Sequence, residues 1–271
     1  MDKQQFLEES HKYLDNLYSE FCEYQRLTDE IFGVFHDLCV ENGIEYCLCS
    51  GTLLGRVRDG GNIPWDYDYD VCMPVNFAQK FIDVLKNKLP EGYTFDSNFV
   101  GNKSPFFQTR IGKKGYDINV LHVDIFYLVG GPKEKTEKFQ KKIKNLFLAR
   151  WGKKLIDNEE KSFIKRIAKK LLLKLKYKST CFFNFDGQFK KLAYKYDYYK
   201  SEKVLLFTYN AEIFDNCAFE PIKCENIGGR DYLMPSSPDA VLNGIYKNYK
   251  EYLPVSDRFE EFYSSVKMMK K

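Results

Sequence analysis

The hydrophobic positions of the first forty residues repeat with the period of an α-helix. Apolar side chains recur at three- and four-residue steps, as at Leu14 and Leu17, and this spacing places them on one helical face. The pair Asn42-Gly43 is typical of a helix end. The pattern therefore predicts a helix over residues 3–42.

Shorter apolar runs downstream predict strands that alternate with helices. The expected strands cover residues 44–50, 68–73, 93–100, 106–111 and 121–129. Helical patterns are expected over residues 53–57, 76–89 and 238–249. Residues 219–222 and 228–235 are typical of a hairpin or a pair of loops, and Tyr252-Leu253-Pro254 is expected to close the fold.

The segment from Lys133 to Lys178 differs in charge from the rest of the chain. It holds 17 basic and 5 acidic residues, although the whole chain has a net charge of only +4. An apolar stripe runs among its lysines at Ile164, Ile167, Leu171, Leu172 and Leu175. Two interpretations stay open: a solvated basic helix that packs one face on the core, or a helix that contacts a membrane surface or an anionic partner. Nucleic acid is disfavoured because no recognised nucleic-acid module accompanies the charge.

Length and composition predict one α/β core with an elaboration. We expect a catalytic core over residues 1–132, a basic helical insertion over 133–200 and a C-terminal part over 201–271 that completes the core. Eight cysteines lack a C-x-x-C pair, and the three histidines lack zinc-ligand spacing with them. Because neither a signal peptide nor a long apolar run is found, we expect a cytoplasmic protein with reduced thiols.

Three aspartates form the most distinctive motif. Asp66, Asp68 and Asp70 alternate with aromatic residues, and alternate side chains of an extended strand share a face. Like charges on one face repel unless a cation lies among them, and Mg²⁺ prefers such oxygen ligands. Asp124 interrupts another apolar strand, where an unpaired carboxylate is costly. If the two strands are neighbours, the acids form a metal site for phosphoryl or nucleotidyl transfer.

A possible phosphate-binding turn lies just upstream of the aspartates. Gly51 and Thr52 follow a predicted strand and begin a helix, so they can present backbone N–H groups and a hydroxyl to an anion. Arg56 and Arg58 do not share a helical face, and we expect Arg58 to reach the phosphates. Arg110, on a predicted strand, is expected either to bind a phosphate or to form a structural ion pair.

These motifs together resemble the LicD family, the fukutin-like branch of the nucleotidyltransferase-fold superfamily. The resemblance rests on Gly-Thr-Leu-Leu-Gly-x-x-Arg at residues 51–58, Pro-Trp-Asp-x-Asp-x-Asp at 64–70 and His-x-Asp-Ile-Phe at 122–126. A weaker similarity covers residues 232–254, whereas residues 133–200 match no pattern that we can name. This chain departs from the common pattern by placing Tyr67 and Tyr69 where the family often has Asp and Ile.

The resemblance implies a mixed β-sheet flanked by helices and a transfer that depends on Mg²⁺ or Mn²⁺. A phospho-alcohol, above all phosphocholine from CDP-choline, would move to a cell-surface glycan or its glycolipid precursor, and CMP would leave. By position, Asp68, Asp70 and Asp124 would be the metal ligands, and Asp66 would support the site or orient the acceptor hydroxyl. Gly51, Thr52 and Arg58 would hold the donor diphosphate.

Two other functions use the same residues. A nucleotidyltransferase that attaches a nucleoside monophosphate to a small molecule or protein would need the same aspartates, and its product would be pyrophosphate rather than CMP. A binding module could use the acidic strand to hold a structural cation. For the leading hypothesis, the basic block predicts peripheral contact with the anionic inner face of a membrane.

Overall fold

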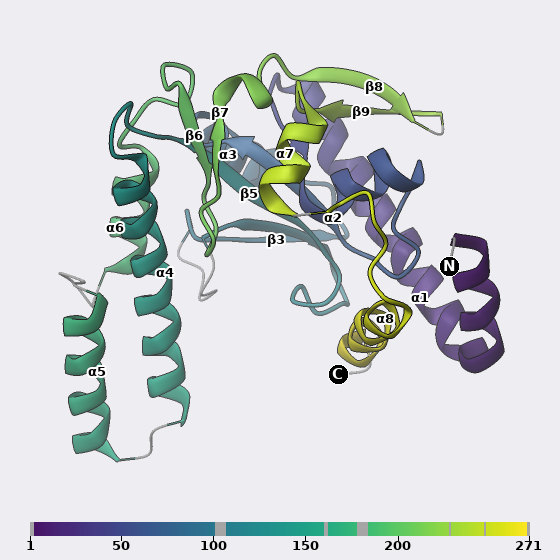
Figure 1. The fold of residues 1–271 in the computed structure, drawn as a ribbon, viewed down its shortest axis with the longest axis horizontal. Helices are drawn as coiled ribbons and strands as arrows, with labels where there is room; N and C mark the ends of the chain where they lie inside the picture. The colour runs from purple at the N-terminus through teal and green to yellow at the C-terminus, as the bar shows by residue number, and fades with distance from the viewer. Residues whose placement is uncertain are drawn as a thin grey trace.

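A mixed β-sheet lies among the helices of the computed structural model (Figure 1). The structure describes residues 3–100, 107–159, 162–177, 184–227, 229–246 and 248–269. Within them the sheet contains β1 (Cys47–Leu48), β2 (Tyr69–Pro74), β3 (Tyr93–Ser97), β4 (Thr109–Lys113), β5 (His122–Gly130), β6 (Lys203–Leu206) and β7 (Ile213–Asp215). The predicted α/β class with a mixed sheet and flanking helices is confirmed.

Strand β5 is the centre of this sheet. It runs parallel to β2 and antiparallel to β4, and its last residues pair with β6. The order β1-β2-β5-β4-β3 continues outward from it on both sides, and β7 pairs with β6. Eight of the nine β5 residues are buried, as expected of a continuous apolar run covered on both faces. Strand β5 thus pairs with β2, β4 and β6 and is almost entirely buried, and these contacts hold Asp124 in place.

Helix α1 (Lys3–Glu41) packs on the sheet against β2, β4 and β5. It ends where predicted, and Gly43 then takes a positive φ of 56° that glycine adopts without a Cβ penalty. The predicted helix at 76–89 is α3 (Ala78–Lys88), which a short 3₁₀ turn over Val75–Phe77 precedes. Phe32 and Phe35 of α1 lie in the core, as do Phe81 and Ile82 of α3.

Several predicted boundaries were wrong. The strand expected over 44–50 contains only β1, and α2 (Ser50–Leu54) begins at once, followed by a π-helical turn over Gly55–Asp59. The hairpin consists of β8 (Lys223–Ile227) and β9 (Arg230–Met234), and α7 (Pro238–Ile245) ends early. Residues 252–254 do not close the fold, since α8 (Val255–Met269) follows them.

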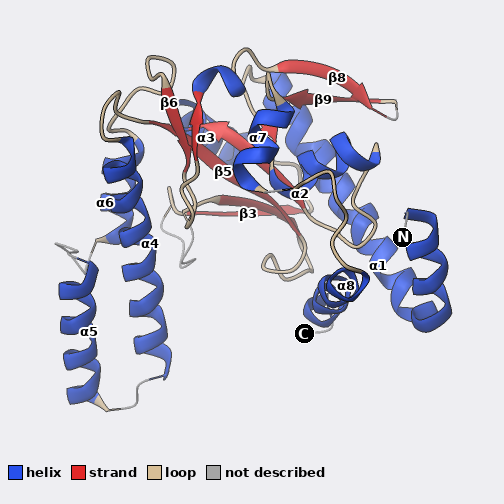
Figure 2. Ribbon diagram, in the orientation of Figure 1, coloured by secondary structure: helices blue, strands red, loops and turns tan. Residues whose placement is uncertain are grey.

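The basic segment forms helices at one end of the sheet. Helix α4 (Thr136–Glu159) and α5 (Phe163–Tyr177) run side by side away from the sheet, and α6 (Phe185–Ala193) contacts α4 (Figures 1 and 2). Phe139, Ile143 and Phe147 bury the first half of α4 in the core. The stripe on α5 does not pack on the core, because its five side chains are 53% to 79% exposed. The first of the two interpretations of this stripe is therefore wrong.

Candidate active site

The aromatic residues between the aspartates pack against helix α1. The ring of Tyr69 stacks on Phe32 with 4.5 Å between ring centroids, and the ring of Tyr67 meets Phe21 edge-on at 6.1 Å. Because side chains alternate along an extended segment, the intervening aspartates point to the other side. The tyrosines that depart from the family pattern are thus core residues, and they do not replace an acid within the carboxylate group.

The carboxylates converge at the N-terminal ends of β2 and β5. Asp70 is the register partner of Asp124 across the parallel strands, so their side chains leave the same face of the sheet. Asp66 and Asp68 lie close enough that each carboxyl shifts the pKa of the other. A Cβ atom on Gly51 would lie 2.7 Å from Oδ2 of Asp66 and 3.9 Å from Oδ2 of Asp70. The two strands are therefore neighbours, which was the condition for the predicted convergence of Asp70 and Asp124; the metal site itself stays a prediction.

The pKa values of Asp66, Asp68 and Asp70 are all raised, so a cation bound among these carboxylates would be favourable. Burial raises the pKa of the Asp66 carboxyl to about 6. Burial and the neighbouring Asp66 raise the pKa of Asp68 well above its ordinary value. Burial and the charges of Asp68 and Asp124 do the same for the pKa of Asp70. Each shift reports a carboxylate whose charged form is disfavoured, because burial removes it from water and other carboxylates lie nearby.

Asp124 differs from the other three acids because two basic side chains hold it. Arg110 on β4 donates from Nε to Oδ1 at 2.7 Å, and Nε2 of His122 lies 3.4 Å from Oδ2. Gln108 adds a hydrogen bond from Nε2 to Oδ1 at 2.8 Å. Burial alone would raise the pKa of Asp124, yet His122 and Arg110 lower it below the ordinary value. Arg110 was expected either to bind a phosphate or to form a structural ion pair, and in the structure it forms the ion pair with Asp124.

Gly51 and Thr52 contact Asp70 directly. The hydroxyl of Thr52 accepts a hydrogen bond of 2.7 Å from the backbone N–H of Asp70, and the N–H of Gly51 donates to the Asp70 carboxylate. The backbone N–H of Cys49 donates to the carbonyl of Asp70 at 3.1 Å. The turn thereby fixes Asp70 at the start of β2. Its predicted contact with the donor diphosphate stays a prediction.

Replacing Gly51 with alanine is expected to displace the acids. The added Cβ would lie 2.7 Å from Oδ2 of Asp66, closer than real Cβ contacts, so the carboxylate must shift. We expect a stability loss of about 1–3 kcal/mol, as for other overpacked sites, together with a loss of donor affinity. Urea unfolding and a donor titration measure both effects. Gly33→Ala in α1 is the matched control, because its Cβ would meet only Nη2 of Arg230 at 3.9 Å; equal losses in the two variants would contradict the expectation.

The two arginines before the aspartates have separate roles. Arg56 donates from Nη2 to the hydroxyl of Tyr69 at 2.5 Å and lies over the ring of Tyr232, away from the carboxylates. Arg58 forms a buried ion pair with Asp59 at 3.0 Å and stacks on the ring of Tyr252 at 4.4 Å. Of these two arginines only Arg58 lines the cavity described next, and its predicted contact with the donor phosphates stays a prediction.

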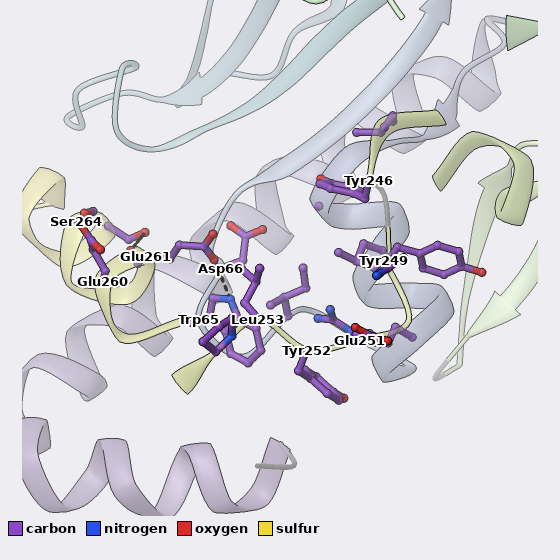
Figure 3. A pocket seen from close by; sticks show the side chains of 18 residues that line it. Trp65, Asp66, Tyr246, Tyr249, Glu251, Tyr252, Leu253, Glu260, Glu261 and Ser264 are labelled. Atoms are coloured by element: carbon purple, nitrogen blue, oxygen red, sulfur yellow. Dashed lines mark hydrogen bonds between the residues drawn. The ribbon is translucent and has the colours of Figure 1, made fainter. Parts of the chain in front are cut away.

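A cavity of about 860 Å³ opens beside Asp66 (Figure 3). This volume is in the usual range for small-molecule sites, roughly 300–1,000 Å³. Gly51, Arg58 and Asp66 form part of its wall, and helix α8 forms another part through Glu260 and Glu261. Aromatic side chains complete the lining, namely Trp65, Tyr246, Tyr249 and Tyr252. Among the predicted site residues, Thr52, Asp68, Asp70, Arg110 and Asp124 are not part of this wall.

The residues of α8 and the segment before it were not predicted as site residues. Oε2 of Glu261 accepts a hydrogen bond of 2.9 Å from the indole N–H of Trp65, which joins residues 196 positions apart. The only signal in the sequence was the weak similarity that ends at residue 254. Since α8 begins after that point, neither Glu260 nor Glu261 could be assigned to the site.

The donor chemistry of the acids suits Mg²⁺ or Mn²⁺, which take carboxylate oxygens. Burial and the neighbouring acids raise the pKa of Asp68 and Asp70, and a divalent cation among the carboxylates would offset both effects. Among the described residues, however, no group of three or more His, Cys, Asp or Glu side chains is placed to hold a metal ion. The metal site therefore stays a prediction.

The mixed sheet, the paired acids and the adjoining cavity define a candidate site for nucleotide or phosphoryl chemistry. Residues 43–157 match the family described as "LicD/FKTN/FKRP, nucleotidyltransferase domain". This part of the chain is thus a LicD-family domain, and the resemblance inferred from the motifs is confirmed. The matched range includes all eight predicted site residues and ends within α4.

Curated relatives match the same part of the chain. The chain is 33% identical over 124 residues to "Lipopolysaccharide cholinephosphotransferase LicD" of Haemophilus influenzae, a match that covers 41% of this chain and 45% of that protein. It is 35% identical over 120 residues to "Mannosyltransferase regulator 4" of Saccharomyces cerevisiae, with 41% of this chain and 10% of that protein covered. The chain therefore spans less than half the length of the relatives it matches.

None of the helices that the structure describes combines the length and the hydrophobicity that crossing a bilayer requires.

Proposed function

We propose that this protein transfers a phospho-alcohol, most specifically phosphocholine, from a CDP-linked donor to a hydroxyl of a surface glycan or its lipid-linked precursor. The observation that carries the proposal is the carboxylate group of Asp66, Asp68, Asp70 and Asp124 beside a ligand-sized cavity. The similarity to a lipopolysaccharide cholinephosphotransferase supports the choice of phosphocholine and of a glycan acceptor.

Each acid has a position that suits a separate task. Asp68, Asp70 and Asp124 would hold Mg²⁺ or Mn²⁺, which when bound neutralises phosphate oxygens and orients the reacting groups. Asp66 lies on the cavity wall, and its carboxyl pKa of about 6 suits a group that accepts a proton from the acceptor hydroxyl near neutral pH. Arg58 faces the same cavity and would bind the donor diphosphate.

The cavity lining supports a cationic alcohol on the donor. A trimethylammonium group is attracted to the faces of aromatic rings and to carboxylates. Trp65 and Tyr252 supply rings, and Glu260 and Glu261 supply carboxylates from α8 (Figure 3). A neutral alcohol such as ribitol or glycerol would gain little from these groups. Among CDP-linked donors the lining therefore favours those with a cationic alcohol, choline and ethanolamine, over neutral ones, and the similarity to a cholinephosphotransferase supports choline.

Removing the two α8 carboxylates tests this choice. We expect Glu260→Gln/Glu261→Gln to raise the KM for CDP-choline by about tenfold, equivalent to about 1.4 kcal/mol, because two attractive charges near the ammonium are lost. The KM for CDP-glycerol, measured under the same conditions, should stay unchanged. Glu225→Gln on the distant strand β8 is the control for loss of surface charge. An equal rise for both donors would contradict the assignment of choline to this wall.

A donor panel tests the reaction class. Purified protein would be incubated with CDP-choline, CDP-ribitol, CDP-glycerol and CDP-ethanolamine and a glycan acceptor, each with Mg²⁺ and with EDTA, and products would be separated by chromatography. The proposal predicts CMP from CDP-choline that disappears with EDTA. Pyrophosphate from a nucleoside triphosphate would instead identify a nucleotidyltransferase. Tight cation binding without turnover of any donor would favour the binding-module alternative.

A further inference from the structure

The apolar face of helix α5 points away from its neighbouring helix. Toward α4, Leu173 packs against Gly152, where a Cβ atom would be only 2.7 Å from Leu173 Cδ1, and Lys170 forms an ion pair with Asp157. Ile164, Leu171 and Leu175 are spaced by seven and four residues, so they lie along one stripe of the helix. Because an α-helix turns by about 100° per residue, this stripe lies on the side of α5 opposite Leu173 and so faces away from α4.

The apolar stripe of α5 is much more exposed to solvent than the apolar face of a helix in a folded domain normally is. Its five aliphatic side chains are 53% to 79% exposed, with Ile164 the most exposed. An amphipathic helix of a globular protein normally turns such a face toward the core. Here the hairpin of α4 and α5 extends away from the sheet (Figure 1), and no described part of the chain covers the stripe. The position and composition of the stripe indicate a contact outside the chain.

The charge around the stripe indicates the kind of partner. Helix α5 carries six basic residues and no acidic residue, and Lys165, Lys169 and Lys176 are exposed beside the stripe. A second copy of this chain would bring like charges together across a symmetric interface. An anionic lipid bilayer satisfies both features, because its headgroups attract lysines and its acyl boundary accepts an apolar face.

We propose that the α4–α5 hairpin binds an anionic membrane surface, with helix α5 lying in the interface and its stripe of Ile164, Ile167, Leu171, Leu172 and Leu175 inserted among the lipids. The proposal is independent of the transfer reaction, since the residues that carry it lie outside the cavity and the carboxylate group. With the lipid-linked acceptor of the proposed function, membrane binding would also bring acceptor and protein to one surface and raise their encounter rate.

Vesicle flotation of the full chain tests this proposal. We expect the protein to float with phosphatidylcholine vesicles that contain phosphatidylglycerol, to stay unbound with pure phosphatidylcholine, and to dissociate as salt is raised. Lys165→Gln/Lys169→Gln should weaken binding at least about tenfold, from about 1 kcal/mol for each lysine near an anionic surface. Leu171→Ser/Leu175→Ser should weaken it at least as much and leave thermal unfolding unchanged, because both side chains are exposed.

Matched measurements separate this explanation from others. Lys86→Gln/Lys114→Gln removes two exposed lysines from another part of the surface and should leave vesicle binding unchanged. Absence of binding to the anionic vesicles, or an equal effect of this control, would overturn the proposal. So would light scattering that finds a dimer which Leu171→Ser/Leu175→Ser dissociates, since the stripe would then be an interface between copies.

Discussion

Replacing Asp68 with asparagine is expected to slow CMP release by at least about 10²–10³-fold, the usual cost of removing one electrostatic contributor to a transition state. The amide keeps the shape of the side chain but removes a charge that would hold the cation and offset the phosphate oxygens. Initial rates with saturating CDP-choline, Mg²⁺ and acceptor measure the effect.

The same substitution is not expected to weaken the fold. Burial and Asp66 raise the pKa of Asp68, so the charged form of this carboxyl opposes folding when no cation is present. Asparagine carries no charge, and the unfolding midpoint of the metal-free protein should stay level or rise. Asp83→Asn on the exposed side of α3 is the control for both measurements. Full activity in Asp68→Asn, or a large fall in its unfolding midpoint, would contradict the role assigned to this residue.

Replacing Arg110 with methionine is expected to lower the free energy of unfolding by about 3 kcal/mol, the lower end of the range for breaking a buried ion pair. Arg110 and Asp124 are 16% and 10% exposed in their side chains, so the loss would leave a carboxylate with little access to water. Urea unfolding at neutral pH measures the change.

A double-mutant cycle identifies the cause of this loss. Arg110→Met/Asp124→Asn should recover most of the stability, because no charge is then left unpaired at this position. Lys113→Met, on the same strand, removes an ion pair with Glu30 whose partners are 27% and 37% exposed, and should cost at most about 1 kcal/mol. An Arg110→Met loss no larger than this, with additive effects in the double variant, would contradict the structural role of the pair.

The alternation of aspartates and tyrosines was sufficient to predict the acidic face. A strand repeats every two residues, so three acids spaced by two had to share one side, and the aromatic residues between them had to share the other. The pairing of Asp70 with Asp124 was conditional on the two strands being neighbours, which the parallel register of β2 and β5 confirms. Local periodicity thus predicted which side chains share a face, and the order of the strands determined that Asp70 and Asp124 are neighbours.

Other parts of the site depend on contacts that no local pattern contains. The pairing of Arg110 with Asp124 could be expected only as one of two alternatives, because a basic residue on a strand can face a ligand or an acid. The hydrogen bond between Trp65 and Glu261 joins segments far apart in sequence. The stripe on α5 was recognised from its spacing, but spacing is the same whether a helical face meets the core or solvent. Only exposure distinguishes the two.

Calorimetric titration of CDP-choline tests the central claim most directly, because donor binding needs no knowledge of the acceptor. The wild-type protein and Asp68→Asn would be titrated with Mg²⁺ and with EDTA, with CDP-glycerol as the comparison donor. The account predicts saturable binding of CDP-choline to the wild type that requires Mg²⁺, favours choline and is lost in Asp68→Asn. Binding that is equal with EDTA and in Asp68→Asn would contradict it, as would the absence of binding under every condition.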